Sequence, residues 1–333
     1  MRGEYDIRKK ALEIVNREKI DIILCSRTFG SFLTSVAAYI AKVKKIPYVI
    51  DVRDEDGQDN GASFLKCGFA GKVDVLRSKL SFCNRLCANH ITRKADALTT
   101  ISPWHTELLK KRYNENTYCI YNGFDPEVFH QLQPEKNSVF EMVYTGTLAT
   151  KSLRDYTFLV EAISSLAMKD LIKPETFKLK FYSGNIVSEN KVKEDFESAG
   201  IKDFVEFLPF VPLSEIPDIF KRASALVVLT AKSGKDGVHG IMTTKFFEYL
   251  ASGRPILCIP SDEECLEAAI IETSSGCAPR IPEEAESYIL SLYNEWKGKG
   301  FTEGKTRQDK LALFSRETQA KQFAELFERL LRD

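Results

Sequence analysis

Short apolar runs alternate with helical patterns along almost the whole chain. Runs of about four to eight residues, rich in β-branched and aromatic side chains, are separated by longer stretches with apolar residues at helical spacing. The runs predicted to be strands are 20–25, 46–52, 95–102, 117–123, 140–146, 177–184, 203–210, 224–230 and 254–260. Strands that are apolar on both faces and alternate with helices are typical of a parallel sheet covered by helices. The fold class predicted from this pattern is therefore α/β.

A polar segment interrupts the alternation at residues 124–138, where FDPEVFHQLQPEKNS contains two prolines and a charged tail. The same order of strands and helices occurs on both sides of it. We therefore expect two Rossmann-like, doubly wound domains that face a cleft, the first over 1–130 and the second over 131–310. Residues 311–333 have an amphipathic pattern and are predicted to be a closing helix. Ligands of open parallel sheets bind beyond the carboxyl ends of the strands, so the polar turns there are candidate sites.

The composition is that of a soluble globular protein, with 44% hydrophobic and 28% charged residues. No apolar run is long enough to span a membrane, and no apolar stretch follows MRGEYDIRKK as in a secretory signal, so a cytoplasmic protein is expected. The eight cysteines form no CxxC pair and no zinc-like cluster, which predicts reduced thiols and no metal site. With 47 basic and 47 acidic residues, no nucleic acid is predicted as a partner.

The stretch HGIMTTKFFEYLASGRPIL, which begins at His239, contains the strongest candidate site. A helix that starts after Thr243 or Thr244 leaves backbone N–H groups unpaired and a partial positive charge at its mouth, which suits a diphosphate. Lys245 in the first turn is unfavourable for the helix dipole, and a bound anion would offset that cost. Glu248 lies one turn later among apolar residues and needs a partner. The alternatives are that Thr244 is an ordinary N-cap and that Glu248 is solvated or paired along the helix.

Five stretches, in this order, resemble the retaining nucleotide-sugar glycosyltransferases of family four, which have the GT-B fold: IPYVIDVRDEDG, KADALTTISPWHTELLKKRY, YNGFDPEVF, YTGTLATKSLRDYTFLVEAI and TTKFFEYLASGRPIL. The resemblance runs from about residue 20 to the end of the chain. It implies transfer of a sugar from a UDP- or GDP-sugar, with retention, to a glycan or lipid-linked acceptor in the synthesis of a surface polysaccharide or glycolipid. It also implies that the acceptor binds mostly on the first domain and the donor mostly on the second.

The resemblance assigns the donor-binding residues to turns at the ends of strands in the second domain. They are Gly146, Thr147, Lys151, Arg154, Asn185, Val211, Thr243, Thr244, Lys245 and Glu248. In this resemblance, Lys151 and Arg154 are the cations for the phosphates, Glu248 accepts hydrogen bonds from the ribose hydroxyls, and the turn at Val211 holds the base. The alternative for Lys151 and Arg154 is a solvated helix start. Thr147 stands where relatives usually have an arginine. No metal or other cofactor is required, because helix N–H groups and cations stabilise the leaving diphosphate.

The family pattern has two glutamates separated by seven residues, and the chain departs from it at the first. Glu248 fills the second position, but Gly240 stands at the first, where the family's glutamate approaches the transferred sugar. His239 immediately precedes this glycine. It is the histidine predicted to take part in catalysis.

In the first domain, the turn DVRDEDG follows a predicted strand and places Asp51, Arg53 and Asp54 at its carboxyl end. Because side chains alternate along a strand, Asp51 and Arg53 share one side and Asp54 belongs to the loop. We predict Arg53 and Asp54 as catalytic residues. The alternative is a structural ion pair between Arg53 and Asp51.

The resemblance also implies that the first domain is incomplete. Relatives have further strand-helix units before the counterpart of the strand at 20–25, equivalent to roughly 80 to 100 residues at about 30 per unit. A partner or a missing segment is expected to complete this domain. The alternative function is therefore a truncated, non-catalytic relative that binds a nucleotide or a partner chain. A nucleotide-sugar epimerase fits TTKFFEYL poorly, and a phosphorylase would need a cofactor lysine site that the sequence does not offer.

Residues 72–94 have apolar residues at helical spacing with lysines and arginines around them. A basic amphipathic helix of this kind suits peripheral contact with anionic lipid at the inner face of the membrane. Packing of the same helix on the sheet is the alternative.

Overall fold

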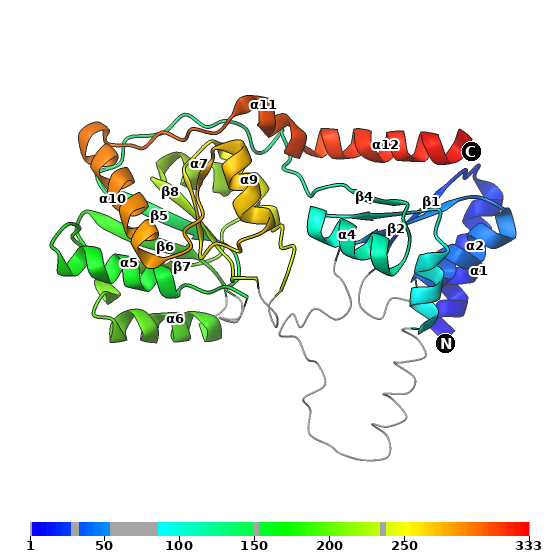
Figure 1. Cartoon of the computed structure of the whole chain (residues 1–333), viewed down its shortest axis with the longest axis horizontal. Coiled ribbons are helices and arrows are strands. Elements are labelled where there is room, and N and C mark those ends of the chain that lie inside the picture. Colours follow the sequence, from blue (N-terminus) through cyan, green and yellow to red (C-terminus); the bar gives the residue numbers. More distant parts are fainter. Residues whose placement is uncertain are drawn as a thin grey trace, which may run out of the picture. The chain divides into compact units, whose positions relative to one another are not determined.

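The structure is a computed structural model of the chain that describes residues 2–27, 33–53, 86–148, 153–184, 186–233 and 238–332. These residues form two compact units (Figure 1). The first unit comprises the described residues up to Tyr121 together with those from Gln319 to the C-terminus. The second unit is Asn122–Thr318. The division falls a little before the predicted limit at residue 130, and most of the closing helix joins the first unit.

The first unit contains a sheet of four parallel strands in the order β1-β2-β3-β4. Its elements are α1 (Arg2–Arg17), β1 (Ile23–Arg27), α2 (Leu33–Lys44), β2 (Tyr48–Val52), β3 (Ala97–Thr100), α4 (Pro103–Arg112), β4 (Thr117–Cys119) and α12 (Arg316–Arg332). On one face, Ile50 and Leu98 of the strands pack with Leu109 of α4. On the other face, Leu326 of α12 packs on Val49 of β2, so the closing helix covers this sheet.

The second unit contains six parallel strands in the order β10-β9-β8-β5-β6-β7. The elements that carry the site are β5 (Phe140–Thr145), α5 (Thr157–Met168), β6 (Phe177–Tyr182), α6 (Ile186–Ser198), β7 (Val205–Leu208), α7 (Ile216–Arg222), β8 (Ala225–Leu229), α8 (Thr244–Ser252), β9 (Ile256–Ile259) and α9 (Cys265–Thr273). They are followed by β10 (Gly276–Cys277), α10 (Pro282–Lys299) and α11 (Gln308–Leu311). The strand order reverses between β5 and β8. Ligands of such sheets bind where the order reverses, at the carboxyl ends of the strands.

Each of the nine predicted strands is present, and the predicted α/β class is confirmed. Seven of the nine end earlier than their apolar runs because the last residues of the run belong to the following turn, whereas β2 ends with its run and β1 ends two residues after it. The tenth strand, β10, has only two residues and therefore gives no periodic pattern. The core of the second unit is aromatic: Phe140 stacks on Phe177 at 5.2 Å between ring centroids, and Tyr293 and Trp296 of α10 cover them.

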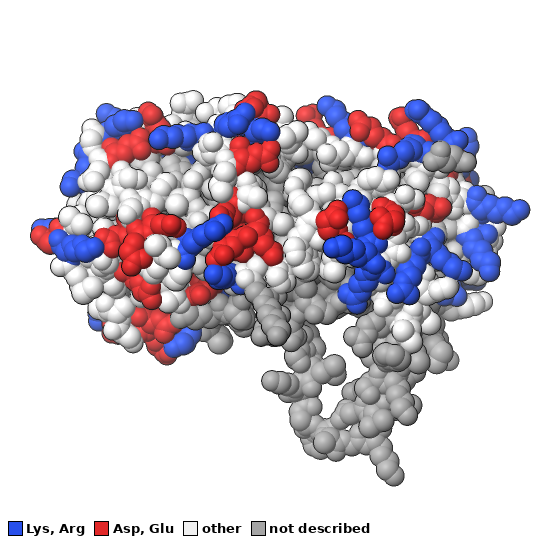
Figure 2. All heavy atoms as spheres, in the orientation of Figure 1, with Lys and Arg blue, Asp and Glu red and all other residues white. Residues whose placement is uncertain are grey.

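The charges are divided unevenly, although they cancel over the whole chain. Among the described residues, the first unit contains 19 Lys and Arg against 11 Asp and Glu, and the second contains 21 against 29. On the face shown in Figure 2, blue side chains gather over the region of α1, α2 and α4. The first unit is therefore a basic body and the second an acidic one. In the part of the chain that the structure describes, no helix has the length and apolarity that a membrane crossing requires.

Candidate functional site

The turn after β5 fits closely against the first turns of α8. Gly146 has a φ of +109°, and a side chain on it would collide with that of Lys245. Its N–H donates to the carbonyl of Tyr182 at the end of β6, at 2.8 Å. One turn further along α8, the hydroxyl of Tyr249 lies 3.0 Å from both the backbone N and Oγ1 of Thr145. Helix α8 is thus fixed against the carboxyl end of β5, with Lys245 lying over the glycine.

Lys245 is a partly buried cation next to another cation. Burial lowers the pKa of its ammonium, and the positive charge of Arg154 lowers it further, while Glu248 acts in the opposite direction. Its Nζ lies 5.5 Å from the centroid of the Tyr144 ring. No carboxylate of the described residues lies within ion-pairing distance of it. The desolvated ammonium and the guanidinium repel each other. A bound anion would reduce this repulsion.

Arg154 shares this environment through Tyr144. Its guanidinium donates to the carbonyl of Leu153 at 3.0 Å, and its charge partly offsets the rise in the pKa of Tyr144 that burial causes. The Tyr144 hydroxyl in turn donates to the carbonyl of Thr147, at 2.9 Å, and the Thr147 side chain is exposed. The predicted cation Arg154 is therefore brought to the same turn as Gly146.

The mouth of α8 has no side-chain cap. Thr243 is the N-cap residue, with φ −69° and ψ 141°, and its hydroxyl makes no capping hydrogen bond. The first turn contains no acidic residue, and Thr244 is exposed. Of the first-turn N–H groups, that of Phe246 donates to the carbonyl of Thr243 at 3.1 Å, and a helix start without a cap or a carboxylate retains its partial positive charge. The alternative was that Thr244 is an ordinary N-cap, but Thr244 is the first residue of the helix and the N-cap position falls on Thr243.

Glu248 lies one turn along α8 from this mouth. Burial raises the pKa of its carboxyl, whereas the charges of Lys245 and Arg316 lower it. The carboxylate accepts no hydrogen bond from any other residue that the structure describes. Burial of a carboxylate without hydrogen-bond donors is unfavourable, so Glu248 is a position where a ligand hydroxyl would be stabilising.

Arg316 was not singled out in the sequence, and it reaches this region from the other end of the unit. Its N–H donates to the carbonyl of Phe124 at 2.9 Å, and its guanidinium lies 3.4 Å from Asp125. At Gly123 a Cβ would lie 2.8 Å from the carbonyl oxygen of Phe314, so the two segments can run this close only with glycine there. Nearly two hundred residues separate the partners in the sequence. No local pattern could have predicted the contact.

His239 and Gly240 are held by a carboxylate from α9's N-cap. Oε1 of Glu264 lies 2.6 Å from Nδ1 of His239, and Oε2 accepts the N–H of Gly240 at 2.9 Å. Gly240 has a φ of +66°, which disfavours most other residues. Gly240, which departs from the expected motif, thus itself binds a glutamate from another element. Glu264 was not predicted from the sequence.

In the first unit, Arg53 forms an ion pair with Asp51, with 2.5 Å between Nε and Oδ2. The other oxygen of Asp51 accepts the hydroxyl of Thr99 at 2.7 Å. The structural ion pair considered as the alternative is therefore present at the end of β2. A catalytic role of Arg53 stays a prediction.

Several predicted residues lie outside the described part of the chain: Asp54, Lys151, Asn185 and residues 72–85 of the basic segment. Of that segment the structure describes 86–94, in which Leu86 is 52% exposed and Thr92 is buried. Val211 is described and lies in the turn after β7, next to the exposed Phe210. The structure thus groups Gly146, Thr147, Arg154 and the α8 residues, and it leaves the other predictions untested.

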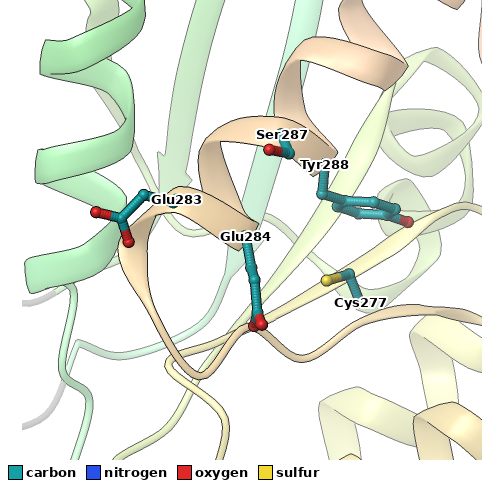
Figure 3. A pocket seen from close by; sticks show the side chains of 5 residues that line it. All are labelled: Cys277, Glu283, Glu284, Ser287 and Tyr288. Atoms are coloured by element: carbon teal, nitrogen blue, oxygen red, sulfur yellow. The ribbon is translucent and has the colours of Figure 1, made fainter.

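A separate hollow of about 510 Å³ lies between α10 and β10 (Figure 3). It is lined by Cys277, Glu283, Glu284, Ser287 and Tyr288. None of these belongs to the predicted site. Burial raises the pKa of the Cys277 thiol to about 11, which makes it a poor nucleophile at neutral pH. Among the described residues, no group of three or more His, Cys, Asp or Glu is placed to hold a metal ion.

Comparison with known proteins agrees with the architecture. No family model matches the sequence. The chain is 24% identical over 210 residues to mannosylfructose-phosphate synthase of Agrobacterium fabrum, a match that covers 57% of this chain and 44% of that protein. The chain therefore spans less than half the length of this curated relative.

Solved structures match over nearly the whole chain. The sucrose-phosphate synthase of Thermosynechococcus elongatus is 13% identical, with a TM-score of 0.62 over 98% of this chain and 77% of that one. HepE of Anabaena, solved with UDP-glucose, is 16% identical, with a TM-score of 0.64 over 96% and 81%. The lipopolysaccharide outer core galactosyltransferase WaaB is 13% identical, with a TM-score of 0.59 over 98% and 80%. At these identities the likeness shows the fold, and it confirms the predicted GT-B class with a small first domain of four strands.

Proposed function

We propose that the chain is a retaining glycosyltransferase that moves a sugar from a UDP- or GDP-sugar to a glycan or lipid-linked acceptor. One observation carries this proposal: the partly buried Lys245 lies over the left-handed Gly146, beside Arg154, at the uncapped start of α8. Two cations and a helix mouth at the point where the strand order reverses suit a diphosphate. The donors named for similar structures, such as the UDP-glucose bound to HepE, are of this class.

The remaining donor contacts follow from the same helix. Glu248 lies one turn beyond the mouth, and its carboxylate suits the two hydroxyls of a ribose, which are paired donors. The base would then lie toward the turn after β7, where Val211 offers backbone groups and Phe210 is 69% exposed. Lys151 and Asn185 complete the proposed donor site.

The proposed chemistry needs no protein nucleophile. The bond between the anomeric carbon and the leaving phosphate oxygen breaks, and the acceptor oxygen forms its bond on the same face of that carbon. The proton of the acceptor hydroxyl passes to the leaving phosphate oxygen. The protein stabilises the negative charge that develops on the diphosphate, and Lys245, Arg154 and the α8 N–H groups are oriented for this before the reaction begins.

The acceptor side is proposed on the first unit, with Arg53 and Asp54 at its strand ends. Synthesis of a surface polysaccharide or glycolipid, at the inner face of the membrane, is the proposed setting. Two solved structures with a similar fold, WaaB and WaaG, have titles that mention lipopolysaccharide, and this fits the proposed setting. A partner chain or further segment that extends the first sheet beyond its four strands belongs to the same proposal.

Calorimetric titration of the purified chain with UDP and with GDP tests the donor site. We expect one nucleotide to bind and Glu248→Ala to weaken it about tenfold or more, because hydrogen bonds to a charged group are lost. The matched control is Glu161→Ala, on the exposed face of α5, which should leave binding unchanged. Indifference of nucleotide binding to Glu248→Ala would contradict the proposal.

A second candidate is a non-catalytic relative that binds a nucleotide or a partner. The four-stranded first unit, smaller than the six-stranded second, favours it. It predicts the same nucleotide binding but no release of nucleotide from a bound nucleotide sugar in the presence of acceptor membranes. Release that depends on Lys245 would favour the enzyme.

A further inference from the structure

Two short segments run side by side in the second unit, although nearly two hundred residues separate them in the sequence. The N–H of Phe124 donates to the carbonyl of Phe314 at 3.0 Å, and the N–H of Arg316 donates to the carbonyl of Phe124 at 2.9 Å. Between these two bonds, Phe124 and Ser315 form a parallel bridge. The next residue of the first segment, Asp125, lies 3.4 Å from the Arg316 guanidinium. The backbone and the side chain of Arg316 are therefore both held by the same segment.

This pair of segments packs on α8 next to Glu248. Phe314 is 4% exposed, and its ring centroid lies 5.6 Å from that of Phe247 and 6.4 Å from that of Phe246. Phe247 directly precedes Glu248 in the helix. The aromatic packing thus fixes the segment that carries Arg316 against the part of α8 that carries Glu248.

Arg316 brings a positive charge to the half-buried carboxylate of Glu248. Burial raises the pKa of this carboxyl, and the charges of Lys245 and Arg316 oppose the rise. Lys245 lies on the same helix and is assigned to the diphosphate in the proposed function, whereas Arg316 comes from outside α8. Arg316 forms its ion pair with Asp125 and not with Glu248. It therefore acts on the carboxylate by its charge and leaves the carboxylate oxygens to a ligand.

We propose that Arg316 is a positioning residue for the ribose of the nucleotide: held by Asp125, it keeps Glu248 a charged acceptor for the ribose hydroxyls without occupying its oxygens. This inference rests on the proposed function and extends it to a residue that is remote in sequence. A charged carboxylate accepts stronger hydrogen bonds than a neutral carboxylic acid does. The preference of the protein for a ribonucleotide over a 2′-deoxyribonucleotide should therefore depend on Arg316.

The test compares the two kinds of nucleotide by calorimetry at neutral pH. The ligands are UDP with 2′-deoxy-UDP, and GDP with 2′-deoxy-GDP. The Arg316 side chain is 61% exposed, so its replacement should leave the fold intact, and each variant is checked for an unchanged thermal midpoint. We expect the wild-type chain to bind the ribonucleotide about tenfold more tightly than its deoxy counterpart, the loss typical of one hydrogen bond to a charged group. Glu248→Ala should abolish this preference.

Arg316→Gln should reduce the preference about threefold or more and leave the affinity for the deoxyribonucleotide within about twofold. Arg316→Lys should retain most of the preference, because it keeps the positive charge. In the Glu248→Ala background, Arg316→Gln should add almost nothing, since Arg316 acts through the glutamate. The matched control is Arg307→Gln, at an arginine that is 51% exposed and pairs with Asp309 at 2.7 Å. It should leave the preference unchanged.

The inference is overturned if Arg316→Gln weakens both nucleotides in parallel, if Arg316→Lys loses as much of the preference as Arg316→Gln, or if the wild-type chain does not distinguish the two nucleotides. A preference that is lost in Glu248→Ala but unchanged in Arg316→Gln also overturns it, and leaves the proposed function intact. A wild-type chain that binds neither UDP nor GDP overturns the proposed function itself. The two failures are therefore distinguishable.

Discussion

At the scale of single residues, the candidate site combines features that are unfavourable without a ligand. Lys245 is a cation that burial and Arg154 both disfavour, and Glu248 is a carboxylate that burial disfavours. Gly146 adopts a conformation that other residues rarely adopt, and it does so where a side chain would strike Lys245. Unfavourable charges and backbone angles that persist in a fold are typical of binding sites. The account therefore predicts that removing one of the unfavourable charges raises stability while it weakens binding.

Replacement of Lys245 by methionine should raise the stability of the protein and weaken its binding of nucleotide. The folded-state pKa of Lys245 is lower than the unfolded value, so the charged ammonium costs stability at neutral pH. That cost is full below the folded-state pKa, declines as the pH rises above it and disappears above the unfolded pKa. We expect Lys245→Met to raise the free energy of unfolding by about 1 kcal/mol at pH 7, as measured in urea, with a smaller gain at higher pH. Lys297→Met, at an exposed lysine that also lies over a tyrosine ring, is the control and should change little.

Gly146→Ala should damage both stability and nucleotide binding. The added methyl group requires the Lys245 side chain to move, and the φ of +109° adds backbone strain. The expected loss is about 2 kcal/mol in the free energy of unfolding. Gly200→Ala is the matched control, because Gly200 also has a positive φ but nothing within 4 Å of an added Cβ. Equal losses in the two variants would show that the contact with Lys245 is unimportant.

At the scale of elements, the sequence pattern predicted the strands and helices that continuous stretches of residues form. It missed the contacts between residues that are distant in the sequence. Strands such as Ala225–Leu229 are buried along their whole length and therefore stand out as apolar runs. Helix α8 was predicted with its mouth, because a threonine pair and an amphipathic pattern occupy consecutive residues. Glu264 and Arg316 were not, since each reaches the site from an element that is remote in sequence. A single sequence contains no signal for such pairs.

The buried Arg254 stabilises the second unit by hydrogen bonds to residues that are distant in the sequence. Its side chain is 2% exposed, and it donates to the carbonyl of Ala223 and to the hydroxyl of Thr302, each at 3.0 Å. Burial lowers the pKa of its guanidinium to about 10. Arg254→Leu should lower the free energy of unfolding by about 3 kcal/mol, because buried acceptors lose their donors.

The comparison for this prediction is Arg280→Leu in urea unfolding. Arg280 pairs with Glu267 at 2.6 Å but is 56% exposed, so its loss should cost less than about 1 kcal/mol. A cost for Arg254→Leu as small as that for Arg280→Leu would contradict the assignment of Arg254 as a buried anchor.

At the scale of the whole molecule, overall neutrality conceals two units of opposite charge. Among the described residues, the first has 19 basic and 11 acidic residues, and the second has 21 and 29. The equal numbers of basic and acidic residues in the chain predicted no overall attraction to a polyanion. That prediction applies to the whole chain and not to each unit. A basic first unit suits approach to an anionic acceptor or an anionic lipid surface.

Vesicle sedimentation tests this property on the full chain. We expect binding to vesicles that contain phosphatidylglycerol and little binding to neutral phosphatidylcholine vesicles. The binding should fall by about tenfold or more between low and high salt, since exposed charges are screened. Equal binding to both vesicle types, independent of salt, would contradict an electrostatic approach.

The central claim is that the mouth of α8, with Lys245 and Arg154, holds a diphosphate. The most direct measurement compares UDP with uridine, or GDP with guanosine, by calorimetry in the wild-type chain and in Lys245→Met. The account predicts that the nucleotide binds much more tightly than the nucleoside in the wild type, and that this difference shrinks about tenfold or more in the variant while nucleoside binding is unchanged. A difference between nucleotide and nucleoside that is the same in both proteins would place the phosphates elsewhere and contradict the claim.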